Sequence, residues 1–382
     1  MLLKSITRSL FFGSVFLSLL NLPVIAQVPT ISYPNGTNLR HYYIGTAISS
    51  ETPTVGGGGF PSQTYVHSIV EEFYSTRNSA TLPLTVPHPN TVFPLDYGQF
   101  AFASQNSQVY SIDWTLQSAV GTAVNGSLNT IFGFIRMSVL GTPKYVYSYP
   151  TTHRIYLSGV GVVGGNPTQV VSGTNNGSAA AGDYALFNSP MAIVPVPNLA
   201  NKIYVADKGN NKIRILDLTT STASDFTITG VTLNAPVGLA VDSGSNLWVT
   251  DSHRLIKITP QGQATVMAGN GTAGDVDGNA SVSRLNTPYG ISIDGSDDVY
   301  FADRMNHKIK VYHPANGILS TMAGSTQGNQ LGLNGAAKFD EPSAVWVSGD
   351  GTLMHVADYN NNKIKSIRMT KAFGISPALP PG

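Results

Sequence analysis

Four stretches in the C-terminal half of the chain share one pattern of apolar and polar positions. Each begins with proline and a short run of small or β-branched residues. A nearly continuous apolar run ending in aspartate follows, as at 202–207 (Lys-Ile-Tyr-Val-Ala-Asp), and a third run alternates basic and apolar residues, as at 308–311 (Lys-Ile-Lys-Val). The continuous run predicts a strand buried on both faces, and the alternating run predicts a half-buried strand. The small residues after proline predict an innermost strand close to a central axis, where bulk is excluded.

The aspartates that end the apolar runs recur 44, 52 and 55 residues apart, at Asp207, Asp251, Asp303 and Asp358. A period of this size is typical of one blade of a β-propeller. Because the aspartate recurs once per blade at the same place, we assign it a structural role. Its carboxylate is expected to accept backbone N–H bonds from the turn that follows.

Two degenerate copies of the pattern lie upstream, at 128–155 and 100–113. Neither keeps the turn aspartate, but four blades are few to close a ring, so we count both copies and expect six blades. The last repeat has no fourth strand of its own, so a strand within 62–92 is expected to complete its sheet and close the ring. Residues 65–74 carry apolar positions at both helical and strand spacing, which leaves their structure open.

The four clear copies resemble the repeats of the NHL family of β-propellers, in particular the exported bacterial proteins whose repeats are joined by Ala-Gly-x-Gly loops. The clear repeats cover 168–369, and the whole propeller is expected over 85–371. The resemblance implies an all-β fold, a six-bladed β-propeller of NHL-type repeats with a short β-rich N-terminal extension. It implies little about activity, because members of the family serve unrelated roles.

The first 26 residues have the character of an export signal. Lys4 and Arg8 precede an apolar stretch at 10–20 that is too short to span a bilayer, and Val-Ile-Ala at 24–26 suits a cleavage site. An uncleaved N-terminal anchor is the alternative. We therefore expect a secreted, periplasmic or cell-surface protein with no membrane span in its mature form.

Residues 27–84 are expected to form the N-terminal extension and to supply the ring-closing strand. The stretch at 28–60 resembles the opening of a bacterial immunoglobulin-like module through Tyr-Tyr-Ile-Gly-Thr-Ala-Ile at 42–48. The alternative is an extended linker or a strand packed against the propeller. The tail at 372–382 contains three prolines and is expected to be disordered.

Composition narrows the classes of partner. Charged residues make up 11% of the chain and the formal net charge is +1, which argues against nucleic acid and anionic membranes as partners. The absence of cysteine removes disulfides, cysteine-based zinc sites and thiol catalysis. The partner is therefore expected to be a protein, a carbohydrate or a small molecule, bound by a monomer.

Two sets of charged side chains invite a functional interpretation. Asp275 and Asp277 lie in a loop that could hold Ca²⁺, although the spacing departs from the EF-hand pattern and the equivalent loops lack these acids. The basic residues of the third strands recur in every clear copy, and we expect them to form a solvated rim. They are Lys212, Arg214, Lys257, Lys308, Lys310, Lys363 and Lys365.

In a propeller, the turns between the second and third strands emerge on the same face as the blade-crossing loops, around the mouth of the central channel. Polar and aromatic residues of these turns are therefore expected to form a binding surface without catalysis. The candidate binding residues are Lys208, Asn210, Asn211, His253, Arg304, Asn306, His307, Tyr359, Asn360 and Asn361.

The alternative is a metal-dependent enzyme of the six-bladed lactonase or lyase type. Such a site needs several Asp, Glu, Asn or His ligands where the inner strands begin. Those positions read Met191-Ala, Val237-Gly, Tyr289-Gly and Ser343-Ala, with Glu341 as the one acid nearby. We find no catalytic constellation, expect no cofactor, and interpret the chain as an exported binding scaffold.

Overall fold

The computed structural model describes residues 65–72, 74–75, 82–83, 89, 91–94, 99–103, 108–113, 118–123, 131–159, 168–172 and 187–371. The chain divides into two compact units, Met1–Phe60 and Pro61–Gly382. The first unit lies outside the described residues. So do the expected export signal, the immunoglobulin-like stretch and the tail at 372–382.

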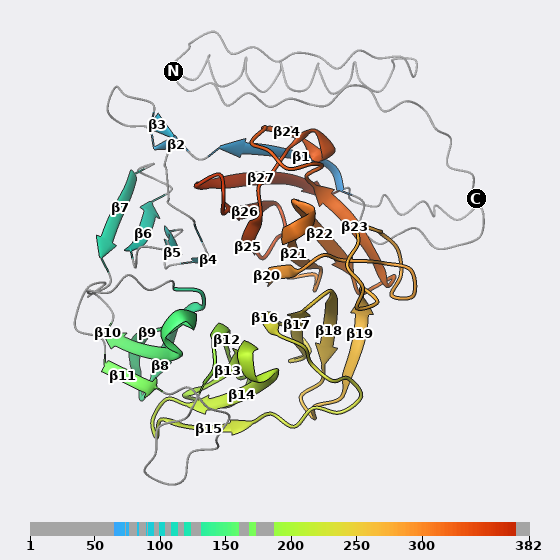
Figure 1. The fold of residues 1–382 in the computed structure, drawn as a ribbon. Coiled ribbons are helices and arrows are strands. Elements are labelled where there is room, and N and C mark those ends of the chain that lie inside the picture. The colour runs from blue at the N-terminus through green and yellow to red at the C-terminus, as the bar shows by residue number, and fades with distance from the viewer. Residues whose placement is uncertain are drawn as a thin grey trace, which may run out of the picture. The chain divides into compact units, whose positions relative to one another are not determined.

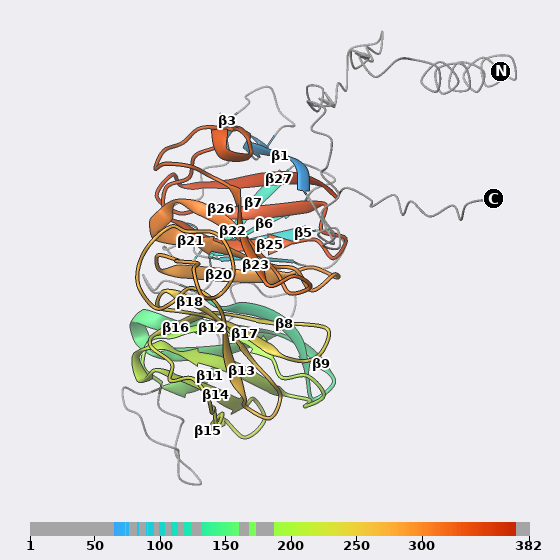
Figure 2. The ribbon, with the colours of Figure 1, turned by 90° about the vertical axis from the view of Figure 1, so that its right-hand side faces the viewer.

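The strands of the second unit form antiparallel sheets arranged around a ring (Figure 1), which Figure 2 shows from the side. Among the described residues, five sheets have four strands each and one has five, and β2 (Tyr74–Ser75) pairs separately with β3 (Leu82–Pro83). The innermost strands β4, β8, β12, β16, β20 and β25 each contact the next one around the ring. The all-β propeller fold is therefore confirmed.

The first two four-stranded sheets come from the upstream part of the chain. One contains β4 (Thr91–Pro94), β5 (Gln99–Ala103), β6 (Gln108–Asp113) and β7 (Ser118–Ala123). The next contains β8 (Phe134–Val139), β9 (Thr142–Tyr149), β10 (Arg154–Gly159) and β11 (Thr168–Ser172). Both degenerate copies of the repeat thus form sheets.

The clear repeats form the remaining three four-stranded sheets and most of the five-stranded one. The third sheet contains β12 (Pro190–Pro195), β13 (Lys202–Asp207), β14 (Lys212–Asp217) and β15 (Thr222–Asp225). The fourth contains β16 (Pro236–Val241), β17 (Leu247–Asp251), β18 (Arg254–Ile258) and β19 (Ala264–Ala268). The fifth contains β20 (Pro288–Ile293), β21 (Val299–Asp303), β22 (Lys308–His313) and β23 (Ile318–Ala323).

The five-stranded sheet closes the ring. It contains β25 (Pro342–Val347), β26 (Leu353–Asp358), β27 (Lys363–Lys371), β1 (Tyr65–Glu72) and β24 (Gly332–Leu333). Residues 65–72 therefore form a strand, and β1 is the expected ring-closing strand, since it pairs antiparallel with β27 and covers that strand's free edge. On the inner side, Ser343 Oγ donates a hydrogen bond of 2.5 Å to the carbonyl oxygen of Pro89, 254 positions away.

The inner strands carry small residues because neighbouring sheets approach closely near the axis. A Cβ atom on Gly238 would lie 2.2 Å from the carbonyl oxygen of Tyr289, and one on Gly290 would lie 2.6 Å from Ala344 Cα. Thr250 Oγ1 bridges the same gap, accepting a hydrogen bond from Gly238 N at 2.8 Å and donating one to Tyr289 O at 2.5 Å. This packing is the physical reason for the Gly or Ala two residues after each proline.

The four turn aspartates are fully buried, but their backbone donors differ from those we expected. Each carboxylate accepts a backbone N–H bond from the loop before the inner strand, and no backbone N–H bond to it from the turn that follows is found among the described residues. The distances are 2.7 Å from Asn188 N to Asp207, 2.7 Å from Asn234 N to Asp251, 2.8 Å from Asn286 N to Asp303 and 2.7 Å from Asp340 N to Asp358. The carboxylate thereby ties the end of the second strand to the start of the first strand of its sheet.

Candidate functional site

The turns between second and third strands, together with the loops that precede the inner-strand prolines, define what we call the turn face. In the third and fifth sheets these turns include short 3₁₀ segments, Lys208–Asn210 and Arg304–Asn306. All ten candidate binding residues lie in such turns. Their hydrogen bonds separate them into three groups.

The first group joins neighbouring sheets. Asn211, His253 and His307 each accept a hydrogen bond from the backbone N–H of the residue before the next sheet's first proline. Ala235 N donates to Asn211 Oδ1 at 2.7 Å, Thr287 N to His253 Nδ1 at 3.2 Å and Glu341 N to His307 Nδ1 at 3.1 Å. Each of these donors has a positive φ, of 57°, 55° and 48° respectively.

His153 makes the same bond one sheet earlier, accepting from Ser189 N at 2.8 Å. We call these four contacts the inter-blade clamps. The N–H groups belong to partly exposed residues in left-handed conformation, which regular strand pairing does not satisfy, so the clamps supply their acceptors. The sequence signal for the clamps is a recurring Asn or His at the end of the turn.

The second group consists of asparagines that hold the turns together. Asn210, Asn306 and Asn361 donate from their amides to the aspartates three residues earlier, at 2.8, 2.7 and 2.8 Å. Asn306 and Asn361 donate in addition to the carbonyl oxygens of Gly274 and Gly328. Asn360 donates from its backbone to Asp340 O at 3.1 Å and from its amide to Asp340 Oδ1 at 3.2 Å.

The third group comes together in a cluster around Arg304. The guanidinium carbon of Arg304 lies 4.7 Å from the ring centre of Tyr289 and 4.9 Å from that of Tyr359. Its Nε and Nη2 donate to Glu341 Oε2 at 3.2 and 2.8 Å. The guanidinium is thus held between two aromatic faces and one carboxylate, drawn from the fifth and sixth sheets of the ring.

Sequence reasoning did not include Tyr289 in this site. Tyr289 follows the inner-strand proline, where the other clear copies have Met191, Val237 and Ser343, and that departure was the available signal. Its ring also meets Phe132 edge-on at 5.1 Å between centres. Phe132, Met191 and Val237 belong to one buried hydrophobic cluster, and Tyr289 packs against it.

Lys208 brings a second cation toward Arg304. Burial lowers the pKa of Lys208, and the charge of Arg304 lowers it further. The Lys208 side chain is half-buried, and among the described residues it makes no hydrogen bond or ion pair. The centre of the turn face therefore holds two cations, one carboxylate and two aromatic rings.

The third-strand bases are not all solvated, so the expected rim is wrong for three of them. Arg214, Lys310 and Lys365 are buried, with 1%, 0% and 0% exposure. Arg214 lies 3.8 Å from Asp207, and Lys365 lies 2.7 Å from Asp358. Blade-crossing loops cover these side chains with Phe187 and Phe339, whose ring centres lie 5.4 Å from the Arg214 guanidinium and 4.9 Å from Lys365 Nζ.

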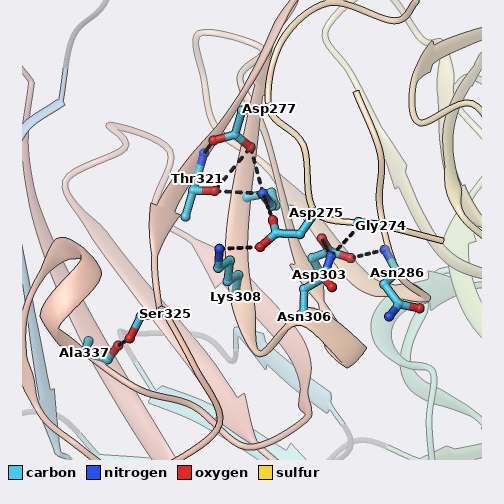
Figure 3. Close-up of polar contacts among 11 residues, drawn as sticks. Gly274, Asp275, Asp277, Asn286, Asp303, Asn306, Lys308, Thr321, Ser325 and Ala337 are labelled. Carbon is cyan, nitrogen blue, oxygen red and sulfur yellow. Dashed lines mark hydrogen bonds and ion pairs between the residues drawn. The ribbon is translucent and has the colours of Figure 1, made fainter. Parts of the chain in front are cut away.

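Asp275 and Asp277, the Ca²⁺ candidates, meet lysines in this structure (Figure 3). Lys310 Nζ donates to both carboxylates at 2.7 Å, and Lys308 Nζ donates to Asp275. Asp277 also accepts from Thr321 N at 2.8 Å. Burial alone would raise the pKa of Asp275, but the bonds from Lys308 and Lys310 lower it overall. These ion pairs engage the oxygens that a Ca²⁺ ion would need.

The described residues offer no group of three or more His, Cys, Asp or Glu side chains placed to hold a metal ion. A cavity of about 260 Å³ occupies the central channel, and none of the described residues that line it is Asp, Glu or His. The catalytic ligands that a lactonase- or lyase-type site would require are therefore not found among these lining residues.

No family model matches the chain. The chain is 37% identical over 112 residues to NHL repeat-containing protein 2 of Bos taurus, which is 28% of this chain and 15% of that protein. It is 25% identical over 283 residues to Protein SUPPRESSOR OF QUENCHING 1, chloroplastic, of Arabidopsis thaliana, which is 70% of this chain and 23% of that protein. The chain thus spans less than a quarter of the length of either relative.

Several solved structures share the fold. An auxiliary nutrient binding protein from Bacteroides thetaiotaomicron superposes with a TM-score of 0.63 at 17% identity, over 80% of this chain and 77% of that one. A streptogramin B lyase superposes with a TM-score of 0.52 at 17% identity, over 80% of this chain and 99% of that one. At this level of identity the likeness concerns the fold alone. Within the residues described, no helix is long and apolar enough to cross a membrane.

Proposed function

We propose that this NHL-repeat β-propeller protein is an exported binding scaffold whose turn face holds a ligand without catalysis. The arrangement of five four-stranded sheets and one five-stranded sheet around the ring supports a six-bladed propeller. Export is supported by the character of residues 1–26, and a role in binding is in keeping with the nutrient-binding protein that shares the fold.

The cluster of Arg304, Tyr289, Tyr359 and Glu341 carries the proposal. Its guanidinium is already fixed by two rings and a carboxylate, so little side-chain entropy remains to be lost when a ligand binds. Burial and, to a smaller extent, the charge of Arg304 disfavour the charged form of Lys208, and an anionic group bound beside Lys208 would stabilise that charge. We infer that the ligand, whether a small molecule, a carbohydrate or a protein side chain, presents an anionic group here.

Titration calorimetry with D-glucuronate and D-glucose tests this proposal, since the two sugars differ in one carboxylate. We expect glucuronate to bind about tenfold more tightly, equivalent to about 1.4 kcal/mol, and Lys208→Met to remove that preference. Lys202→Met is the matched control, because Lys202 begins β13 at the end of the strand away from the turn face. Equal binding of the two sugars, or a preference that survives Lys208→Met, would contradict the site.

A further inference from the structure

The central channel holds a partly open cavity, lined by residues other than those of the turn-face cluster. Its cavity of about 260 Å³ is lined by residues of β8, β12, β16, β20 and β25 and by Val92 of β4. The innermost strands of all six sheets, β4 included, thus line a single cavity. Nothing in the proposed turn-face site requires this space.

The cavity is closed toward the turn face. Phe132, Met191 and Val237, near the starts of their inner strands, have exposures of 5%, 4% and 3%. The lining residues at the far ends of the inner strands, Val241, Ile293 and Trp346 among them, are partly exposed. The channel therefore opens on the face opposite the turn face.

The walls carry no charged side chain among the described lining residues. Ser292 supplies the one hydroxyl, and this group already accepts a hydrogen bond of 3.1 Å from Val347 N. Trp346 stacks on His355 with 5.6 Å between ring centres and 10° between planes. Burial lowers the pKa of His355 to about 3, and the charge of Arg368 contributes, so this backing imidazole is neutral at ordinary pH.

These walls favour an uncharged occupant. An ion placed here would lose its hydration without gaining a partner of opposite charge, which is strongly unfavourable. The inner strands are the edge strands of their sheets, so peptide groups along their free edges offer a few hydrogen bonds. An apolar cavity of about 150 Å³ binds benzene, so about 260 Å³ has room for about ten non-hydrogen atoms.

We propose that the central channel binds an uncharged, mainly apolar molecule or group of about ten non-hydrogen atoms, a fused two-ring aromatic being the best fit, entering from the face opposite the turn face. Trp346 forms one wall for such a ring system, and one polar atom of the ligand can meet a strand edge.

The test uses 2-naphthol and 2-naphthoate, which share a ring system and differ in charge at neutral pH. Binding is followed by calorimetry and by the change in tryptophan fluorescence, to which Trp346 in the channel wall contributes. We expect one saturable site for 2-naphthol on the full chain and binding of 2-naphthoate weaker by about tenfold or more.

Two variants localise the site. Ala192→Phe fills the channel at a partly exposed lining position, and Val241→Lys places a charge at its open end without adding bulk to its floor. Each substitution should weaken 2-naphthol binding by about tenfold or more. If Ala192→Phe does not fold, Val241→Lys still tests whether 2-naphthol binds in the channel. Leu140→Ser, at a position that is 75% exposed and outside the channel, is the control.

Absence of 2-naphthol binding, equal binding of 2-naphthoate, or unchanged affinity in both channel variants would overturn the proposal. Lys208→Met separates the two sites, because it should abolish the preference for glucuronate and leave 2-naphthol binding unchanged. The turn-face site and the channel site can thus fail independently.

Discussion

The fourth and fifth sheets of the ring follow one repeat template but neutralise their buried turn aspartates differently. In the fifth sheet Asp303 is followed by a four-residue turn, and the third strand then delivers Lys310, which is fully buried. In the fourth sheet only two residues separate Asp251 from Arg254, whose guanidinium, 19% exposed, pairs directly with that aspartate.

The strand register shows why the turn length matters. Lys310 pairs with Phe301, two residues before its aspartate, and the corresponding partner of Val249 in the fourth sheet is Ile256. The shorter turn therefore places an apolar residue in the slot that holds a buried cation in the other clear repeats. With two fewer residues in the turn, the interior ion network is replaced by an ion pair between the buried Asp251 and the partly exposed Arg254.

The largest difference between the two sheets should appear when each cation is removed. Lys310→Met leaves Asp275 and Asp277 without the ammonium that they share and removes a positive charge that lowers the pKa of the buried Asp303, so we expect a loss of about 3–5 kcal/mol in the free energy of unfolding. Arg254→Met should cost about 1–2 kcal/mol, because water can reach that pair. Urea unfolding at pH 7 measures both.

Lys202→Met is the control for these two variants, since its pair with Asp217 is 3.9 Å long and its side chain is 39% exposed. It should change the free energy of unfolding by about 0–1 kcal/mol. Equal losses for Lys310→Met and Arg254→Met would show that burial of the cation does not distinguish the sheets.

The inter-blade clamps should make the two sheets behave alike. His253 links the fourth sheet to the fifth, and His307 links the fifth to the sixth. Replacing either with leucine leaves a backbone N–H without its acceptor, and we expect each to cost about 1–2 kcal/mol in urea unfolding.

Asparagine already serves as the clamp at Asn211, so His253→Asn should retain most of the stability that His253→Leu loses. If the leucine and asparagine variants are equally stable, the acceptor atom is not what the clamp contributes. That outcome would favour a ligand-binding role for His253 and His307 over a role in joining the sheets.

The smallest expected difference between the two sheets is in the pKa values of their turn aspartates. Burial raises the pKa of Asp303 to about 7 and that of Asp251 to about 6. Between the unfolded-state pKa, about 4, and the raised native pKa, the native state keeps a proton that the unfolded chain has lost. The stability that each carboxyl contributes therefore declines as the pH rises through this window. The window runs from about pH 4 to about pH 7 for Asp303 and from about pH 4 to about pH 6 for Asp251. Carboxyl ¹³C NMR titration checks the order, and Asp251 titrating above Asp303 would reverse the comparison.

Part of the candidate site could be read from the sequence, and part could not. Lys208, Arg304 and Tyr359 do lie together with aromatic and charged neighbours on the turn face, because their turns fall at equivalent places in successive repeats. The other seven candidates occupy the same turns, yet their polar atoms are engaged within the fold. In a repeat protein, a polar residue that recurs in every repeat is more often needed for the structure of the repeat than for binding a ligand. The sequence pattern is the same whether the residue is structural or ligand-binding.

The sequence by itself determined the strands of the clear repeats, their order and the need for a closing strand from upstream. These follow from local apolar periodicity and from the repetition of one template, which act through neighbouring residues. Only the tertiary structure decided which charges are buried, which side chains join adjacent sheets and where the channel opens. Those properties depend on contacts between repeats, such as Phe187 over Arg214 or Glu341 against Arg304, whose geometry is set by turn length and close packing around the axis.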